Sequence, residues 1–207
     1  DGKSKTLMGE FYLDYKNRYF HARAGRQVLK TPLTVLMTSL TPNFYEAYML
    51  DTNIVDNLKL TAGHISKISY GSRAMADWGL IGEKTGTAGV GLGGSGILFE
   101  QAGGDLEQAK FYNIGTAAGK KSTSGRSVIG ASYFGIKNLK ADLWVYHSYD
   151  IVDDYYAELK YTIPLSNDMK LKLSAQYLMQ KDTGDSLAGD RDFNMIGTKV
   201  AIGTKKW

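Results

Sequence analysis

The clearest feature of the sequence is an alternation of apolar and polar positions with a period of two. In the segment 169–180, MKLKLSAQYLMQ, leucine, alanine, tyrosine and methionine alternate with lysine, serine and glutamine. The segments 139–148 and 154–163 alternate in the same way, and a turn cluster of serine, asparagine and aspartate at 166–168 follows the second of them. Because a period of two places successive side chains on opposite faces of a strand, these segments predict consecutive β-hairpins.

The same period, in a weaker form, extends over most of the chain. The N-terminal region predicts strands over 7–16 and 19–24, and a later strand is predicted to end near Ile136. Weaker candidate strands lie at 43–52, 58–67, 96–102, 106–115 and 192–203. The total is about eleven strands. Two of the segments, 106–115 and 44–50, are equally compatible with a short helix.

Two properties of the predicted strands favour a membrane-spanning sheet. The clearest strands are about 10 to 12 residues long, whereas strands of soluble proteins average about five or six and tilted membrane strands need about nine to eleven. The connections also alternate in length. Tight connections are predicted near 17–18, 53–57, 103–105, 137–138 and 165–168, and longer ones near 29–42, 68–95, 116–125, 149–153 and 181–191. Short turns at one end and long loops at the other are typical of transmembrane β-barrels.

The face opposite the apolar one is rich in charge, and two interpretations of it remain open. In a soluble or surface-exposed β-rich ligand-binding domain, the apolar face would form the core and the charged face would be solvated. In an outer-membrane barrel, the apolar face would contact lipid and the charged face would line a water-filled channel. The channel-lining residues would then be Glu10, Asp14, His21, Arg23, Lys59, Asp142, Tyr146, Glu158, Lys160, Lys172 and Lys199.

Composition excludes several other classes of protein. The absence of Cys excludes a disulfide-stapled miniprotein, and 24 Gly among 207 residues are too many for a coiled coil. No run of about 18 to 20 apolar residues predicts a spanning helix. The 25 Lys and Arg residues and the 21 Asp and Glu residues are mixed along the chain, so no clustered basic face predicts a nucleic-acid partner.

The longest predicted connection, 68–95, is rich in glycine and is expected to fold into the barrel and narrow its lumen. The charged residues of this loop nearest the solute path would be Arg73, Asp77, Glu83 and Lys84. The loop also contains Gly89, Gly91 and Gly94 at the spacing of a dinucleotide-binding fingerprint. That motif functions only between a strand and a helix, and no helix is predicted after it, so no cofactor is expected.

No constellation of side chains predicts catalysis or metal binding. His21, His64 and His147 are far apart in the sequence, and none forms a pair with metal-ligand spacing. A G-x-S-x-G nucleophile motif is absent, although the sequence leaves open a contact of His147 with Asp142 or Asp150. We expect neither an enzyme nor a metal site.

Four stretches of the chain carry strings that together resemble one known family. They are RAGRQVLKTP at 23–32, LTPNFYEAYML at 40–50, NLKLTAGHISK at 57–67 and the long run at 139–190. The chain resembles the OprD-type family of outer-membrane porins, especially its branch in ε-class proteobacteria. The resemblance covers most of the chain, but it consists of many strand and loop phrases of low individual specificity.

The resemblance implies a barrel of about eighteen antiparallel strands in a Gram-negative outer membrane, with an inward-folded third external loop and a signal peptide lost on export. It implies passive uptake of small hydrophilic solutes, often carboxylate-bearing amino acids or organic acids. Membrane lipid and lipopolysaccharide would surround the protein, as a monomer or a trimer. The family's basic channel ladder is matched in part by Arg23 and Lys59, and weakly by Lys160, Lys172 and Lys199. Because Lys lacks the bidentate grip of Arg on a carboxylate, the substrate preference stays open.

The chain departs from this family in length. About eleven strands is an odd number, whereas bacterial single-chain barrels close with an even number, and the family's barrel needs roughly twice this chain. If 68–95 is the third external loop, about one strand is missing in front and about six behind. Residues 1–207 are therefore expected to be one partial barrel domain, either a fragment or an incompletely determined chain.

Overall fold

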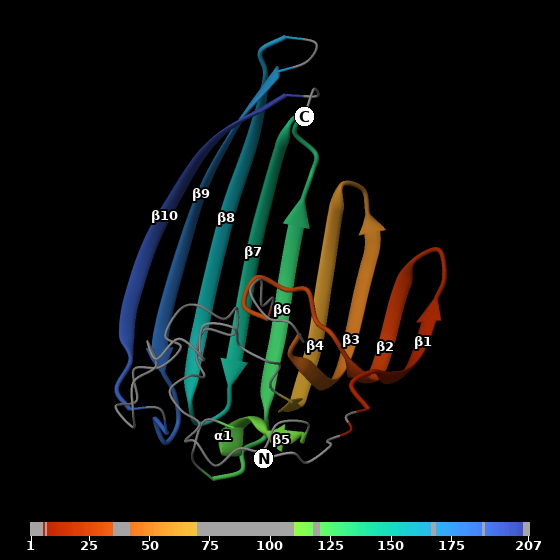
Figure 1. The fold of residues 1–207 in the computed structure, drawn as a ribbon, viewed down its shortest axis with the longest axis vertical. Coiled ribbons are helices and arrows are strands. Elements are labelled where there is room, and N and C mark those ends of the chain that lie inside the picture. Colours follow the sequence, from red (N-terminus) through yellow and green to blue (C-terminus); the bar gives the residue numbers. More distant parts are fainter. Residues whose placement is uncertain are drawn as a thin grey trace.

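The computed structural model describes residues 6, 8–34, 42–69, 110–117, 121–166, 169–187 and 189–204. Within these residues the chain forms a curved antiparallel β-sheet with one short helical turn, α1 (Ile114–Ala117) (Figure 1). The strands are β1 (Phe11–Lys16), β2 (Phe20–Gln27), β3 (Phe44–Val55), β4 (Leu58–Ser69), β5 (Tyr112–Asn113), β6 (Arg126–Tyr133), β7 (Leu139–Ser148), β8 (Val152–Pro164), β9 (Met169–Asp182) and β10 (Asp192–Thr204).

The sheet is built by pairing neighbours along the chain. Its order is β1-β2-β3-β4-β6-β7-β8-β9-β10, and β5 pairs only with the end of β4. Every strand pair is antiparallel, so the hairpins predicted around 139–182 are confirmed. No helix in the described part of the chain has the length and apolar character needed to cross a membrane.

The two alternatives for 106–115 are each met in part within its described residues, where a strand is limited to two residues and a short helix begins at Ile114. Only Tyr112 and Asn113 form a strand there, and α1 follows directly. The cause is the Asn113 side chain, whose Oδ1 accepts hydrogen bonds from the backbone N–H groups of Gly115 and Thr123, each at 2.9 Å. A side chain that captures nearby backbone donors in this way ends a strand. The predicted strand 96–102 lies outside the described residues, whereas 44–50 is part of strand β3.

The strand lengths agree with the prediction where the chain is described, and the connections agree with it except at 149–153. Five strands have 12 to 14 residues. The tight turns at 17–19, 56–57 and 134–138 and the turn between β8 and β9 lie at one end of the sheet, at the top of Figure 1. At the other end, the connection predicted as a longer one at 149–153 is also tight: only residues 149–151 separate β7 from β8, because the Ile151 N–H donates to the Ser148 carbonyl at 3.0 Å. Asn57 and Asn138 adopt positive φ angles of 60° and 65° in two of the tight turns, a conformation that Asn tolerates better than most residues. Strand β4 continues to Ser69, two residues beyond the predicted end.

The two faces of the sheet differ in composition and in cover. One face, called here the outer face, exposes large apolar side chains such as Leu13 (81%), Ile196 (75%) and Val200 (71%). The opposite inner face carries most of the charged side chains. Because the apolar face is exposed, it is not the dry core that a soluble domain would need, and the arrangement favours the membrane interpretation.

Residues 28–34, called here the strap, leave the end of β2 and fold over the inner face. Leu29 and Leu33 of the strap pack in a buried cluster with Tyr45, Ile65 and Tyr146 of the sheet. Tyr45 Oη donates to the Thr34 carbonyl at 3.3 Å, and the Leu33 N–H donates to Tyr146 Oη at 3.4 Å. The predicted connection 29–42 therefore begins as an ordered segment that is anchored to the inner face.

Replacing Gly25 by Ala should destabilise the β1–β2 pairing. Gly25 has a φ of 128°, and a Cβ there would lie 2.4 Å from the Phe11 carbonyl oxygen. The substitution should lower the free energy of unfolding by about 1–3 kcal/mol, the cost of such backbone strain. Gly203→Ala is the control, because nothing lies within 4 Å of its added Cβ, and its effect should stay within about 0.5 kcal/mol. Urea unfolding of liposome-reconstituted protein, followed by tryptophan fluorescence, measures both, and equal losses would contradict the prediction.

Candidate functional site

The inner face and the strap enclose a cavity of about 590 Å³. Its walls come from strands β2, β3, β4, β6, β7 and β8, with strap residues Val28–Pro32 on one side. Five Lys and Arg side chains and three Asp and Glu side chains line it, an excess of two positive charges. The lining residues include Arg23, Lys30, Asp51, Lys59, Lys140, Asp142, Trp144, Tyr156, Glu158 and Lys160.

Strand register places the predicted channel-lining residues on one face. Their cross-strand pairs are Asp14 with Arg23, His21 with Asp51, Lys59 with Ser132, Asp142 with Glu158, Tyr146 with Asp154, Lys160 with Ser174, Thr162 with Lys172, and Lys199 with Ser174. Glu10 precedes β1, and its Oε1 accepts from the Val28 N–H of the strap at 3.4 Å. The shared face is a matter of geometry, and the role of these residues in lining a channel stays a prediction.

The predicted residues are not all in the same surroundings on that face. The cavity itself is lined by His21, Arg23, Lys59, Asp142, Glu158 and Lys160. Tyr146 is fully buried beneath the strap. Lys172 and Lys199 lie farther along the face, towards the tight turns, and have no ion-pair partner among the described residues. The predicted constriction residues Arg73, Asp77, Glu83 and Lys84 lie outside the described residues.

Acidic and basic side chains on the inner face are paired between or along neighbouring strands. Asp14 Oδ2 accepts from His21 Nε2 at 2.8 Å and from Arg23 Nε at 2.7 Å. The Arg23 guanidinium also lies 4.2 Å from the centre of the Tyr12 ring, a distance at which a cation is attracted to an aromatic face. Arg23 is thereby held in one orientation on the inner face.

Three further ion pairs continue this arrangement across the sheet. Lys59 Nζ lies 3.1 Å from Asp51 Oδ2, Lys140 Nζ lies 2.8 Å from Asp142 Oδ2, and Lys160 Nζ lies 2.7 Å from Glu158 Oε2. Thr61 and Ser132 donate to the Asp51 and Asp142 carboxylates, which anchors the acids more firmly than the long Lys side chains. The Lys side chains are about half exposed and therefore remain accessible to a solute.

Sequence reasoning missed several residues of this cavity. Lys140 and Asp51 lie on the same face as Asp142 and Lys59, which were predicted to line the channel. The alternation of faces along each strand could therefore have identified them. The strap residue Lys30 could not be found in this way, because it belongs to no strand. The apolar Leu29 and Leu33 inside a predicted loop were the available signal that this loop packs on something.

A buried ion pair lies on the inner face beside the strap. Arg126 Nη2 lies 2.6 Å from Asp154 Oδ2, and their side chains are only 3% and 0% exposed. Gln180 Nε2 donates to the other Asp154 oxygen at 2.5 Å, and the Arg126 guanidinium lies 4.5 Å from the Tyr146 ring centre. The pair joins strands β6, β8 and β9 and supports the tyrosine on which the strap packs.

The remaining histidines point to the outer face. His147 Nδ1 lies 2.5 Å from Asp153 Oδ1, so its acidic partner is neither Asp142 nor Asp150. His64 Nδ1 lies 3.2 Å from Ser127 Oγ. Among the described residues, no group of three or more potential ligands is arranged to hold a metal ion.

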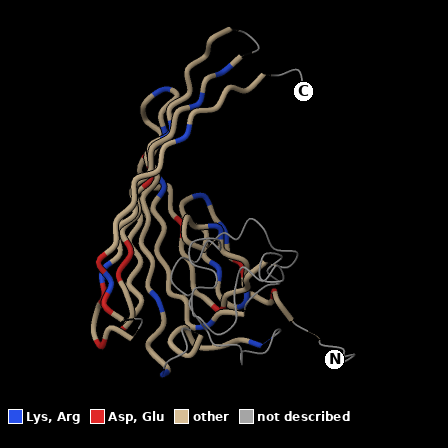
Figure 2. Tube along the Cα trace, turned by 60° about the vertical axis from the view of Figure 1, so that its left-hand side comes forward, with Lys and Arg blue, Asp and Glu red and all other residues tan. Residues whose placement is uncertain are grey.

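Figure 2 shows how charge is distributed along the strands. In β8 to β10, acidic positions gather near the ends with the longer connections, and basic positions lie towards the tight turns. At the end with the longer connections, Lys121 Nζ donates to Asp185 Oδ2 at 2.5 Å, and this hydrogen bond raises the pKa of the Lys121 ammonium. Strands β8 to β10 therefore carry a gradient of charge along their length.

Comparison with known proteins places this geometry in a family. A family model described as outer membrane porin, OprD family, matches residues 1–206. Porin D of Pseudomonas aeruginosa is 30% identical over 143 residues, which cover 58% of this chain and 32% of Porin D.

Two solved structures from Pseudomonas aeruginosa share the fold. OpdK with vanillate matches with a TM-score of 0.67 and 15% identity, over 93% of this chain and 43% of OpdK. OpdF in complex with glucuronate matches with a TM-score of 0.64 and 14% identity, over 93% of this chain and 44% of OpdF. The fold is that of a transmembrane antiparallel β-barrel, which confirms the predicted fold class. The chain spans less than half the length of these relatives.

Removing one partner of the buried ion pair should strongly destabilise the protein. Asp154→Leu leaves the Arg126 guanidinium buried without its carboxylate, and such a loss costs about 3–5 kcal/mol. The double variant Arg126→Met/Asp154→Leu should recover most of that loss, because no uncompensated charge remains. Lys121→Gln, which removes an exposed ion pair, should leave stability unchanged within error. Urea unfolding measures all three, and a double variant no more stable than Asp154→Leu would contradict the explanation.

Proposed function

The chain belongs to the OprD family of outer membrane porins, and from this premise we propose that the protein forms a passive, water-filled channel for small hydrophilic solutes. Its location is the outer membrane of a Gram-negative bacterium. The observation that carries the proposal is the contrast between the two faces of the same strands. The outer face exposes apolar side chains, whereas the inner face carries paired charges around a cavity of about 590 Å³. Lipid on one side and water on the other account for this contrast.

The strap is proposed to narrow the channel at the end with the longer connections. It covers part of the inner face and forms one wall of the cavity. The segment 68–95 is proposed as a second, external constriction, with Arg73, Asp77, Glu83 and Lys84 as its charges. In this arrangement selectivity comes from the bore and from fixed charges.

The preferred solutes are proposed to carry a carboxylate. The excess of two positive charges in the cavity lining favours an anionic group. The Arg23 guanidinium can bind a solute carboxylate in bidentate fashion when that carboxylate displaces Asp14. Two relatives of this fold were solved with vanillate and with glucuronate, both carboxylate anions. Most cations of the cavity are Lys, whose grip on a carboxylate is weaker, and a broad preference is therefore expected.

Catalysis is not part of the proposed function. Ser132, the serine among the described lining residues, donates to Asp142, and four of the five cavity cations, Arg23, Lys59, Lys140 and Lys160, are engaged in ion pairs. The assignment to the ε-proteobacterial branch is also a proposal, supported by the strings at 23–32 and 139–190. A soluble binding domain remains the alternative function, but the exposed apolar face argues against it.

The full-length protein should conduct ions. Reconstituted in planar lipid bilayers, it should produce discrete conductance steps, because a charged lumen remains hydrated. The protein should also fractionate with the outer membrane and require detergent for extraction. The absence of conductance steps at every voltage would overturn the channel proposal.

Removing inner-face cations should shift ion selectivity towards cations. Arg23→Ala leaves Asp14 with one partner fewer, and Lys172→Ala removes a charge that has no described ion-pair partner. In a salt gradient, the reversal potential of each variant should move towards cation preference. The shift should be smaller in 1 M salt than in 0.1 M salt, because the electrostatic screening length falls from about 10 Å to about 3 Å between these concentrations.

The matched control for this selectivity test is Lys181→Gln. Lys181 lies opposite Asp153 on the outer face, so its loss should leave the reversal potential unchanged. If Arg23→Ala and Lys172→Ala lower stability but leave the reversal potential at its wild-type value, those residues do not face the pore.

A further inference from the structure

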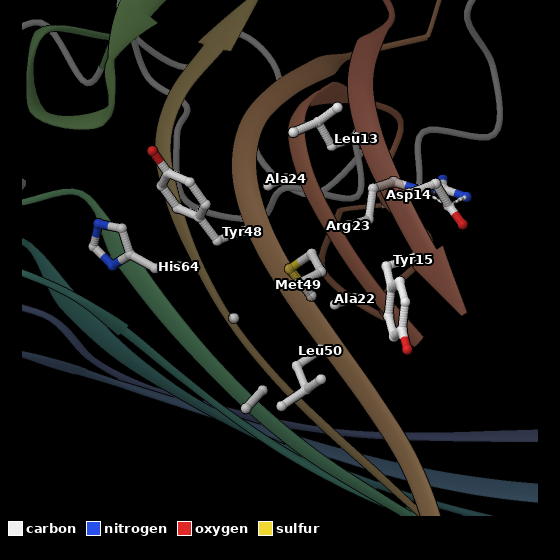
Figure 3. Close-up of a pocket in the computed structure, with 12 residues that line it drawn as sticks. Leu13, Asp14, Tyr15, Ala22, Arg23, Ala24, Tyr48, Met49, Leu50 and His64 are labelled. Carbon is white, nitrogen blue, oxygen red and sulfur yellow. Dashed lines mark hydrogen bonds and ion pairs between the residues drawn. The ribbon is translucent and has the colours of Figure 1, made fainter. Parts of the chain in front are cut away.

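An apolar groove of about 610 Å³ crosses strands β1 to β4, and its exposed side chains belong to the outer face. Figure 3 shows Leu13 and Tyr15 of β1 on one side of the groove and Tyr48 and Leu50 of β3 on the other. Between them the β2 side chain is only Ala22 or Ala24, and Ala62 of β4 continues the floor. The groove exists because small residues lie beside large, exposed ones. It lies on the opposite face of the sheet from the charged cavity, and Arg23 and Met49 line both.

The groove leads into a charged cluster on the same face. Beyond Ala24, the next outer-face residue of β2 is Arg26, and beyond Tyr48 the next on β3 is Glu46. Glu46 pairs in register with Lys67 of β4. Its carboxylate lies 3.6 Å from Arg26 Nε and 2.9 Å from Lys67 Nζ. Two cations with one acid between them leave an excess of one positive charge, and both cations are about two-fifths exposed.

Three adjacent strands therefore change polarity together. On β3 the sequence along the outer face is apolar Leu50, amphipathic Tyr48 and charged Glu46. On β2 the outer-face residues Ala22 and Ala24 are followed by Arg26, and on β4 Ala62 and His64 are followed by Lys67. The four steps from Leu50 to Glu46 span about 13 Å along the strand, or about 10 Å of depth for a strand tilted by about 40°. That is the distance over which a leaflet changes from hydrocarbon to headgroup, and a tyrosine lies where such a boundary places it.

We propose that this groove and the Arg26–Lys67 cluster form a binding site for a phosphorylated glycolipid of the outer leaflet. One acyl chain would lie in the groove, against Ala22, Ala24 and Ala62. A glycolipid phosphate would contact the Arg26 guanidinium and the Lys67 ammonium, displacing part of their contact with Glu46. The Arg26 guanidinium also lies 4.4 Å from the Phe111 ring centre, which holds it on the outer surface.

The position of the Arg26–Lys67 cluster along the strands indicates which leaflet supplies the lipid. The cluster lies at the end of the strands that carries the longer connections, and in barrels of this class those connections face the cell exterior. The lipid of that leaflet is the phosphorylated glucosamine lipid of lipopolysaccharide. A second copy of the protein would cover an apolar groove as well, but it would not by itself account for two clustered cations.

Native mass spectrometry of the full-length protein in detergent tests the site, with lipid A bearing two phosphates as the probe. The wild-type protein should retain lipid A in preference to phosphatidylglycerol and to lipid A stripped of phosphate. The variant Arg26→Gln/Lys67→Gln should bind lipid A at least about tenfold more weakly, because charge-assisted contacts to phosphate are lost. Ala24→Leu should also weaken binding by filling the groove.

Matched controls lie on the same face away from the groove. Lys181→Gln removes an outer-face cation at the same end of the sheet, and Ala157→Leu enlarges an outer-face alanine of β8, so both should bind lipid A like the wild type. Every variant should conduct ions normally, which verifies folding and separates this test from the test of the channel.

Three results would overturn the site. The first is unchanged lipid A binding in both Arg26→Gln/Lys67→Gln and Ala24→Leu. The second is equal retention of phosphatidylglycerol and lipid A, which would remove the argument for a glycolipid. The third is an oligomer that Ala24→Leu dissociates without any change in lipid A binding, which would make the groove a contact between copies. If the double variant fails to fold, Ala24→Leu against Ala157→Leu decides the outcome.

Discussion

The pairing of backbone groups is the constraint on which the rest of this structure depends. In hydrocarbon, an unpaired N–H or C=O group has no water to bind, so a strand must be paired along its whole length. The β9–β10 ladder meets this demand without interruption from Met169 and Thr204 to Lys181 and Asp192. In a fully paired strand, each side chain lies on one of the two faces of the sheet, and successive side chains alternate between them. The period of two in the sequence and the contrast between an apolar and a charged face both follow from this alternation.

The inner face solves two different electrostatic problems along its length. Next to the strap, Arg126 and Asp154 are excluded from solvent, and each charge has to be matched by a partner at short distance. In the open cavity, Lys59 and Lys160 remain about half exposed, and their ion pairs cost little to break because water replaces the partner. The buried Arg126–Asp154 pair therefore supports Tyr146, on which the strap packs, whereas the exposed pairs leave their cations half open to solvent. The proposed channel would use both, since a constriction must be rigid and its charges must be exchangeable.

Local sequence was enough to predict the strands and the faces, and it failed where side chains act across long distances. The alternation at 169–180 identified β9 because face and polarity coincide at each position. At 106–115 the alternation is similar, but Asn113 binds backbone donors of Gly115 and Thr123, a contact that no period reveals. The strap depends on Leu33 meeting Tyr146, 113 residues later. Such a contact depends on the pairing of five strands, β2, β3, β4, β6 and β7. The pattern within a single segment does not reveal that pairing.

Strand parity gives two arginines of β2 different surroundings. Arg23 and Arg26 are three residues apart, and an odd separation places them on opposite faces. Arg23 joins Asp14 and His21 on the inner face, whereas Arg26 joins Glu46 and Lys67 on the outer face. Arg26 is therefore not on the face that carries Arg23 and the other predicted channel-lining residues. A guanidinium can bind an anion by planar, bidentate chemistry, and parity gives each of the two a different proposed ligand, an anionic solute for Arg23 and a lipid phosphate for Arg26.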